Sequence, residues 1–194
     1  MLKSPIPDIS ISCIETRHPE KAAKALMHTL HVCQELPVKK IYWFSDGACP
    51  TQEAIAQKWG EEFLKWIPIN PFNPDGSFND QLSHLTLDLL PRTVETDFNL
   101  LIQADGYAVN ADAWSNSFFE YDYIGATWPK EPEGRNVGNG GFSWRSKKLY
   151  QSILDIRSKY SLDAMFESSA VDETWFDKFG GRSIPEDNLI AKVY

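Results

Sequence analysis

The chain has 194 residues and a mass of 22.1 kDa, with 42% hydrophobic and 24% charged residues, which predicts one globular domain over residues 1–194. Its 27 acidic against 19 basic residues give a net charge of -8, which argues against nucleic acid and anionic membranes as partners. No apolar run approaches the roughly 20 residues that span a bilayer, and no signal-like segment opens the chain, so we expect a cytoplasmic protein without a transmembrane segment.

The first third of the chain alternates strand and helix patterns. Expected strands cover residues 9–14, 40–44 and 66–69, and expected helices begin at Pro19 and at Gln52, behind Thr51 as N-cap. Strands that alternate with helices are typical of βαβ units, in which the strands run parallel.

The later pattern adds a buried helix and a central strand. Leucines at helical spacing predict a helix over 78–90 that Pro91 ends, and the apolar run 98–103 is typical of a strand buried on both faces. A further helix is predicted over 147–160. Together these elements predict an α/β fold with a mainly parallel sheet.

Asp105 follows the apolar run directly, and ligands of open α/β sheets bind at the carboxyl ends of strands. Mg²⁺ and Mn²⁺ commonly take one or two protein carboxylates together with substrate phosphate oxygens, so Asp105 is a candidate ligand for a divalent cation. Gly106 leaves room for a bulky ligand beside it. Asp-Gly is equally typical of a simple turn.

The segment Gly138-Asn139-Gly140-Gly141 matches neither the P-loop nor the dinucleotide-binding fingerprint. Its glycines allow the backbone to approach a flat ligand, and the Asn139 amide offers both a donor and an acceptor, which suits a sugar. A hairpin turn is the alternative interpretation.

Glu186 and Asp187 follow Pro185 where a helix is expected to begin. Asp187 is a candidate general base that takes the proton of an attacking hydroxyl, or else an N-cap. Serine and cysteine hydrolases are not supported, because no G-x-S-x-G elbow is present and Cys13, Cys33 and Cys49 lack a catalytic or metal-binding spacing. We expect these cysteines to be buried thiols.

Several segments form an ordered set: Glu15-Thr16-Arg17, QADG at residues 103–106, YDYIGATW at 121–128, VGNGGFSWRS at 137–146 and Pro185-Glu186-Asp187. In this set the chain resembles the family of GT-A-like glycosyltransferases catalogued as domain of unknown function 5672, from about Ile9 to its end. The resemblance implies a three-layer α/β/α sandwich of Rossmann-like type and a nucleotide diphosphate sugar as donor.

The resemblance also implies roles for individual residues. Gln103 and Asp105 stand where other GT-A enzymes carry an Asp-x-Asp metal motif, and the Gln leaves one carboxylate for the cation. By likeness to fringe-type β1,3-glycosyltransferases, Glu186 and Asp187 form the catalytic acid pair, with the second acid as base. We assign nucleotide binding to Thr16, Arg17, Asp46 and Gln103, and sugar or acceptor binding to Trp128, Asn139, Gly140 and Gly141.

The function expected from this resemblance is transfer of a hexose from a nucleotide diphosphate sugar to a hydroxyl acceptor on a glycan, with inversion, as in polysaccharide biosynthesis. Arg17 is equally compatible with a surface salt bridge. Related chains continue beyond Pro-Glu-Asp, which leaves three alternatives for a chain without the C-terminal metal ligand or lid common in GT-A enzymes: a naturally short member, a truncated gene product or a degenerate one. A catalytically inactive module that binds nucleotide sugar or glycan is the alternative, and a structural scaffold is a further rival.

Overall fold

The computed structural model describes residues 6–71, 73, 78–127, 138 and 140–159. In chain order its main elements are β1 (Ile9–Ile14), α1 (Pro19–Val32), β2 (Val38–Ser45), α2 (Gln52–Trp59), η1 (Glu61–Phe63), β3 (Leu64–Pro68), α3 (Phe78–His84), η2 (Leu85–Leu89), α4 (Leu90–Thr93), β4 (Phe98–Ile102), η3 (Ala111–Ala113), η4 (Asn116–Glu120), β5 (Tyr123–Gly125), β6 (Ser143–Ser146) and α5 (Lys147–Arg157).

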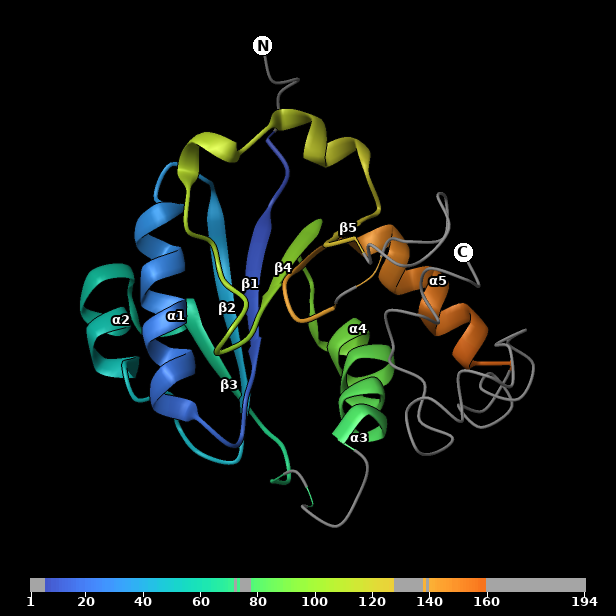
Figure 1. The fold of residues 1–194 in the computed structure, drawn as a ribbon, viewed down its shortest axis with the longest axis horizontal. Helices are drawn as coiled ribbons and strands as arrows, with labels where there is room; N and C mark the ends of the chain where they lie inside the picture. Colours follow the sequence, from blue (N-terminus) through green and yellow to red (C-terminus); the bar gives the residue numbers. More distant parts are fainter. Residues whose placement is uncertain (1–5, 72, 74–77, 128–137, 139, 160–194) are drawn as a thin grey trace.

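Within the described ranges the strands form a six-stranded sheet in the order β3-β2-β1-β4-β6-β5. The pairs β3-β2, β2-β1 and β1-β4 are parallel, whereas β6 runs antiparallel to β4 and β5. Helices lie on both faces, with α1 and α2 on one and α3, α4 and α5 on the other (Figure 1). The expected three-layer α/β/α sandwich with a mainly parallel mixed sheet is therefore confirmed.

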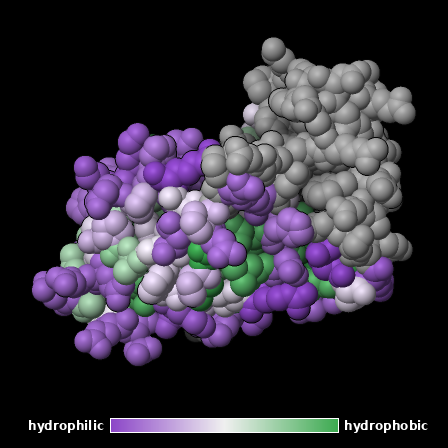
Figure 2. Space-filling view, turned by 90° about the horizontal axis from the view of Figure 1, so that it is seen from below, coloured by the Kyte–Doolittle hydropathy of each residue, from purple (hydrophilic) through white to green (hydrophobic). Residues whose placement is uncertain are grey.

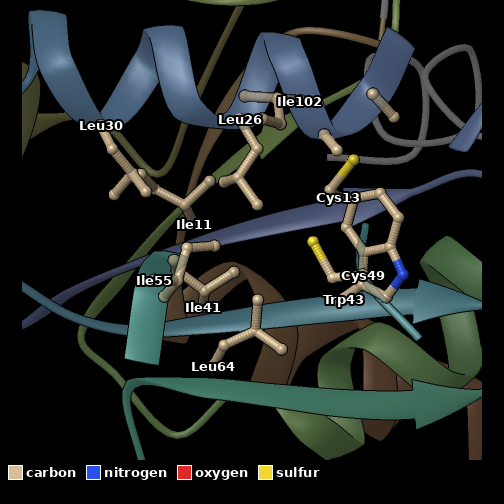
Figure 3. Packing of buried hydrophobic residues seen from close by; sticks show 12 residues of the cluster. Ile11, Cys13, Leu26, Leu30, Ile41, Trp43, Cys49, Ile55, Leu64 and Ile102 are labelled. Carbon is tan, nitrogen blue, oxygen red and sulfur yellow. The ribbon is translucent and has the colours of Figure 1, made fainter. Parts of the chain in front are cut away.

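The core is divided by the sheet into two hydrophobic clusters. On the α1 face, side chains of β1, β2 and β4 pack against Leu26 and Leu30 of α1 and Ile55 of α2 (Figure 3). On the opposite face, Leu101 and Phe44 pack against Leu149 and Ile153 of α5. Each central strand contributes to both clusters because successive side chains of a strand point to opposite faces.

One prediction about this fold is wrong at Pro91. The helix does not end there, because η2 is a π-helical turn in which the Leu90 N–H donates to the Leu85 carbonyl, and the helix continues through α4 to Thr93. Pro91 has no N–H to donate, but it lies in the first turn of α4, where proline is tolerated. Thr51 does precede α2, but its side chain makes no capping hydrogen bond.

Candidate functional site

The candidate site lies at the carboxyl edge of the parallel strands, at the bottom of Figure 1. From β1 the chain moves to β2 on one side, whereas β4 pairs with β1 on the other, so the strand order reverses between β1 and β4. Ligands of open α/β sheets bind at such a switch point. The loops that follow β1 and β4 carry the predicted Thr16, Arg17, Gln103 and Asp105.

The loop after β1 is held by its own carboxylate. Glu15 Oε1 accepts hydrogen bonds from the N–H groups of Arg17 at 2.6 Å and His18 at 3.0 Å. The Glu15 N–H donates to the Phe44 carbonyl at 3.0 Å, which ties this loop to the end of β2. Glu15 thus fixes the backbone, and the Arg17 side chain beside it is exposed.

The turn after β2 is held by two indole rings. Trp66 Nε1 donates to the Ser45 carbonyl at 3.0 Å, and Trp43 Nε1 donates to the Gly47 carbonyl at 3.1 Å. Asp46 lies between these two anchored residues, is exposed, and accepts a hydrogen bond from Ser45 Oγ at 3.2 Å. Its carboxylate is therefore presented at the same edge as the β1 loop.

Asp105 lies in a closed four-residue turn after β4. The Gln103 N–H donates to the Gly106 carbonyl at 2.9 Å, and the Gly106 N–H donates to the Gln103 carbonyl at 3.3 Å. Asp105 is exposed at this turn, where its carboxylate is accessible to a ligand. Over the described part of the chain, no cluster of three or more His, Cys, Asp or Glu side chains could hold a metal ion.

The glycine segment lies against this turn. Because β6 runs antiparallel to β4, with Ser143 opposite Leu101, the residues before Ser143 return to the carboxyl edge. A Cβ added to Gly106 would lie 3.1 Å from the Gly141 carbonyl oxygen and from Phe142 Cβ. The structure thus brings Gly141 against Gly106, the residue after Asp105, although more than 30 residues separate the two glycines in sequence.

Two buried polar residues behind the glycines were not predicted. Arg145 Nε donates to Ser143 Oγ at 2.9 Å, Ser143 Oγ donates to the Gly140 carbonyl at 3.0 Å, and Arg145 Nη2 lies 3.5 Å from that carbonyl. Ser143 and Arg145 share one face of β6, with Trp144 between them facing the other way. This alternation of polar and aromatic residues is the sequence signal that could have indicated them.

The two buried thiols, Cys13 and Cys49, do not supply a nucleophile. Burial raises the pKa of Cys13, at the end of β1, well above its ordinary value, with smaller contributions from Glu15 and Cys49. Burial also raises the pKa of Cys49, and the two cysteines lie near Trp43 in the cluster of Figure 3. Both side chains therefore stay protonated at neutral pH, and a reactive thiolate is not available there.

Figure 2 views the molecule from this edge. Hydrophobic residues gather near the middle of the described part of this face, and mostly hydrophilic residues lie beside and below them. Four predicted site residues, Trp128, Asn139, Glu186 and Asp187, lie outside the described residues.

Comparisons with known proteins give a family and a fold. The model of a family described as a protein of unknown function, DUF5672, matches residues 74–189. The galactosyltransferase LgtC, solved in complex with donor and acceptor sugar analogues, is 12% identical with a TM-score of 0.56, and the match covers 95% of this chain and 68% of LgtC. The apo form of the glycosyltransferase GlyE of Streptococcus pneumoniae TIGR4 is 16% identical with a TM-score of 0.50, over 93% of this chain and 45% of GlyE.

At these identities the two enzymes show the fold alone, which is GT-A-like as expected. No curated protein matches the chain in sequence. Among the described helices, none combines the length and apolar character needed to cross a membrane.

Proposed function

Because the chain belongs to the DUF5672 family and has a GT-A-like fold, we propose that it is a glycosyltransferase that moves a sugar from a nucleotide diphosphate sugar to a hydroxyl acceptor on a glycan. The observation that carries this proposal is the meeting of the Asp105 turn and the glycine segment beside the β1 loop, at the point where the strand order reverses. LgtC, whose fold the chain shares, was solved with donor and acceptor sugar analogues.

In this proposal the nucleotide lies over the ends of β1, β2 and β4. Arg17 pairs with phosphate or stacks on the base, since a guanidinium can do both. Thr16, Asp46 and Gln103 supply the polar contacts to the base and ribose, and the exposed Asp46 carboxylate suits a ribose hydroxyl. Each of these residues lies on a loop whose backbone is held by hydrogen bonds, from the Glu15 carboxylate, from the Trp66 indole or within the turn after β4.

Asp105 fits a divalent cation as one ligand of several. Its carboxylate is exposed at the turn, and hard cations often combine one or two protein carboxylates with substrate phosphate oxygens. A bound Mn²⁺ or Mg²⁺ would neutralise the charge that develops on the leaving diphosphate. Because this turn carries a single carboxylate, the protein supplies few of the cation's ligands and the donor's phosphate oxygens supply others. We therefore expect the cation and the donor to bind together.

Acceptor activation is assigned to Asp187, with Glu186 as its partner in the acid pair, on the sequence grounds given above. A carboxylate within hydrogen-bond reach of the acceptor hydroxyl takes its proton as the oxygen attacks the sugar carbon, and the diphosphate leaves. Direct attack of this kind inverts the configuration. Trp128 and Asn139, with Gly140 and Gly141, shape the pocket for the sugar and the acceptor.

The test is a thermal-shift panel of uridine and guanosine diphosphate sugars with and without Mn²⁺, followed by an assay of sugar transfer. A ligand that binds only the folded state raises the free energy of unfolding by mass action, by about 2.7 kcal/mol at a hundred times its Kd, and the melting temperature rises with it. Asp105→Asn should keep the fold and lose the Mn²⁺-dependent part of the shift. No shift with any donor would refute the proposal, whereas a shift without transfer would indicate a binding module.

Asp187→Asn tests the assignment of the base once a donor and an acceptor are known. Loss of a positioned base costs roughly a hundredfold to ten-thousandfold in rate, so transfer should nearly vanish while donor affinity is kept. Because Asn is itself a good N-cap, a purely capping role predicts parental turnover and parental stability.

A further inference from the structure

Arg145 is a fully buried cation just behind the candidate site. Its side chain is 0% exposed, on a strand whose residues are all buried. A guanidinium is removed from water at a high cost in free energy unless its N–H groups find acceptors. The partners of this group therefore indicate which part of the molecule it stabilises.

Arg145 contacts the Gly140 carbonyl both directly and through Ser143. Ser143 Oγ donates to this oxygen at 3.0 Å and itself accepts from Arg145 Nε at 2.9 Å, while Arg145 Nη2 approaches the same oxygen at 3.5 Å. Ser143 is 1% exposed, so water does not compete for these groups. Hydrogen bonds from a charged donor are stronger than neutral ones, and this arrangement turns the Gly140 carbonyl inward.

The inward carbonyl determines the direction of the next amide. In a trans peptide unit the C=O and the following N–H point in opposite directions, so the Gly141 N–H points away from Arg145. Within the described residues this N–H donates no hydrogen bond, and Gly141 is only half-buried. Its neighbour across the site is Gly106, next to Asp105.

We propose that Arg145 and Ser143 are positioning residues, which fix the Gly140–Gly141 peptide so that the Gly141 N–H donates a hydrogen bond to an oxygen of the transferred sugar. The inference rests on the proposed function, because it places the sugar of the donor at this segment. Neither side chain touches the substrate itself.

A purely structural role is the rival, because the same face of the sheet carries other buried hydrogen bonds. Tyr150 Oη donates to Asn99 Oδ1 at 2.9 Å, and Asn99 Nδ2 donates to Ser10 Oγ at 2.8 Å and Ser12 Oγ at 2.9 Å. Tyr150→Phe is therefore a matched control: it removes a buried hydroxyl from the same face without touching Gly140.

The experiment compares the affinity for a nucleotide sugar with that for its nucleotide alone, using UDP-glucose against UDP and GDP-mannose against GDP. Ser143→Ala and Arg145→Lys should lower the nucleotide-sugar to nucleotide affinity ratio by about tenfold, which is the loss expected for one hydrogen bond. Tyr150→Phe should lower the melting temperature and keep the parental ratio. A ratio unchanged in both site variants would overturn the inference.

A spectroscopic measurement tests the positioning without any donor. The carbonyl ¹³C shift of Gly140 and the amide ¹⁵N shift of Gly141 respond to hydrogen bonds on that carbonyl, so both should move in Ser143→Ala and stay in Tyr150→Phe. If the parent binds none of the nucleotide sugars, the proposed function fails while these shifts still report on the carbonyl. Shifts that stay parental in both site variants contradict the positioning itself.

Discussion

Arg17 and Asp105 reach the same edge of the sheet from neighbouring strands. The Glu15 carboxylate fixes the backbone before Arg17, and a closed turn presents Asp105. A cation and a carboxylate at a switch point suit a ligand that carries both phosphate and metal. Neither residue needs burial for this role, because the ligand itself would exclude water from between them.

Arg17→Ala should weaken the binding of a nucleotide diphosphate sugar by about tenfold or more, the effect of losing one hydrogen bond to a charged group, and should change the melting temperature little. Arg92→Ala is the control, because Arg92 is an exposed arginine that pairs with Asp88 at 3.0 Å within one helical stretch. Calorimetric titration of both variants measures the difference. Equal donor affinity in Arg17→Ala and the parent contradicts the role in donor binding.

The three thiols should differ in reactivity. Cys13 and Cys49 are buried at 0% and 4% exposure, whereas Cys33 at the end of α1 is partly exposed. A maleimide added to the native protein should therefore label Cys33 first, and label the other two only on unfolding. Mass spectrometry of digested samples shows the order. Rapid labelling of Cys13 would mean that the α1 face of the sheet opens readily.

At the scale of elements, the contact between the β4 turn and the glycine segment depends on Gly106. A Cβ there would lie 3.1 Å from the Gly141 carbonyl oxygen, so Gly106→Ala should push the two segments apart and cost about 1–3 kcal/mol. Donor binding should weaken with it. Gly47→Ala is the control, because a Cβ on Gly47 meets no atom within 4 Å. Urea unfolding and donor titration measure both effects, and equal behaviour of the two variants would contradict the contact.

The junction of β5, β6 and α5 depends on a carboxylate away from the site. Asp122 accepts from Lys148 Nζ at 2.6 Å and from Ser146 Oγ at 2.6 Å, and Ser146 caps α5 by accepting from the Leu149 N–H. These hydrogen bonds, from Lys148 first and Ser146 second, lower the pKa of Asp122 from its ordinary value of 3.8. Because the pKa is lower in the folded state, the stabilisation is present above about pH 4 and is lost as the pH falls through the folded value.

Asp122→Asn should therefore destabilise the protein at pH 7 by about 1 kcal/mol or less, since the ion pair is exposed. The difference from the parent should shrink as the pH falls below 3.8. Melting temperatures of both proteins from pH 7 to pH 3 measure this difference. A gap that stays constant over the range would mean that the charge of Asp122 contributes nothing.

The sequence predicted the strands and helices that have regular patterns, and missed the short ones. β1, β2 and β4 carry apolar or alternating runs, and this hydrophobic pattern alone indicates a strand. β5 has three residues and β6 four; β6 pairs with β4 and β5 pairs with β6, and no local sequence pattern shows this pairing. The same limit applies to the site. Asp105 was predicted from its place after a strand. The hydrogen bonds of Ser143 and Arg145 to the Gly140 carbonyl depend on the antiparallel pairing of β6 with β4, which the sequence does not show.

At the scale of the whole molecule, the two hydrophobic clusters share their strands. Ile14, Phe44 and Leu101 pack under α5, and their neighbours Cys13, Trp43 and Ile102 pack under α1. If one of these strands detaches from the sheet, both clusters lose its side chains. The two helical layers therefore depend on the same strands. The site at the carboxyl edge is built from loops of these same strands, and its geometry depends on both layers.

We therefore expect unfolding as one cooperative unit, in agreement with the single domain that the sequence predicts. Hydrogen exchange at increasing urea concentration should give the same opening free energy and the same urea dependence for buried amides of α1 and α5, because small single domains usually unfold in an all-or-none transition. A saturating donor should raise both by an equal amount, since a ligand at the shared edge binds only the folded sheet. If α5 opens well before α1, or if the donor protects only one of them, the two layers are separate units and the single-domain prediction is wrong.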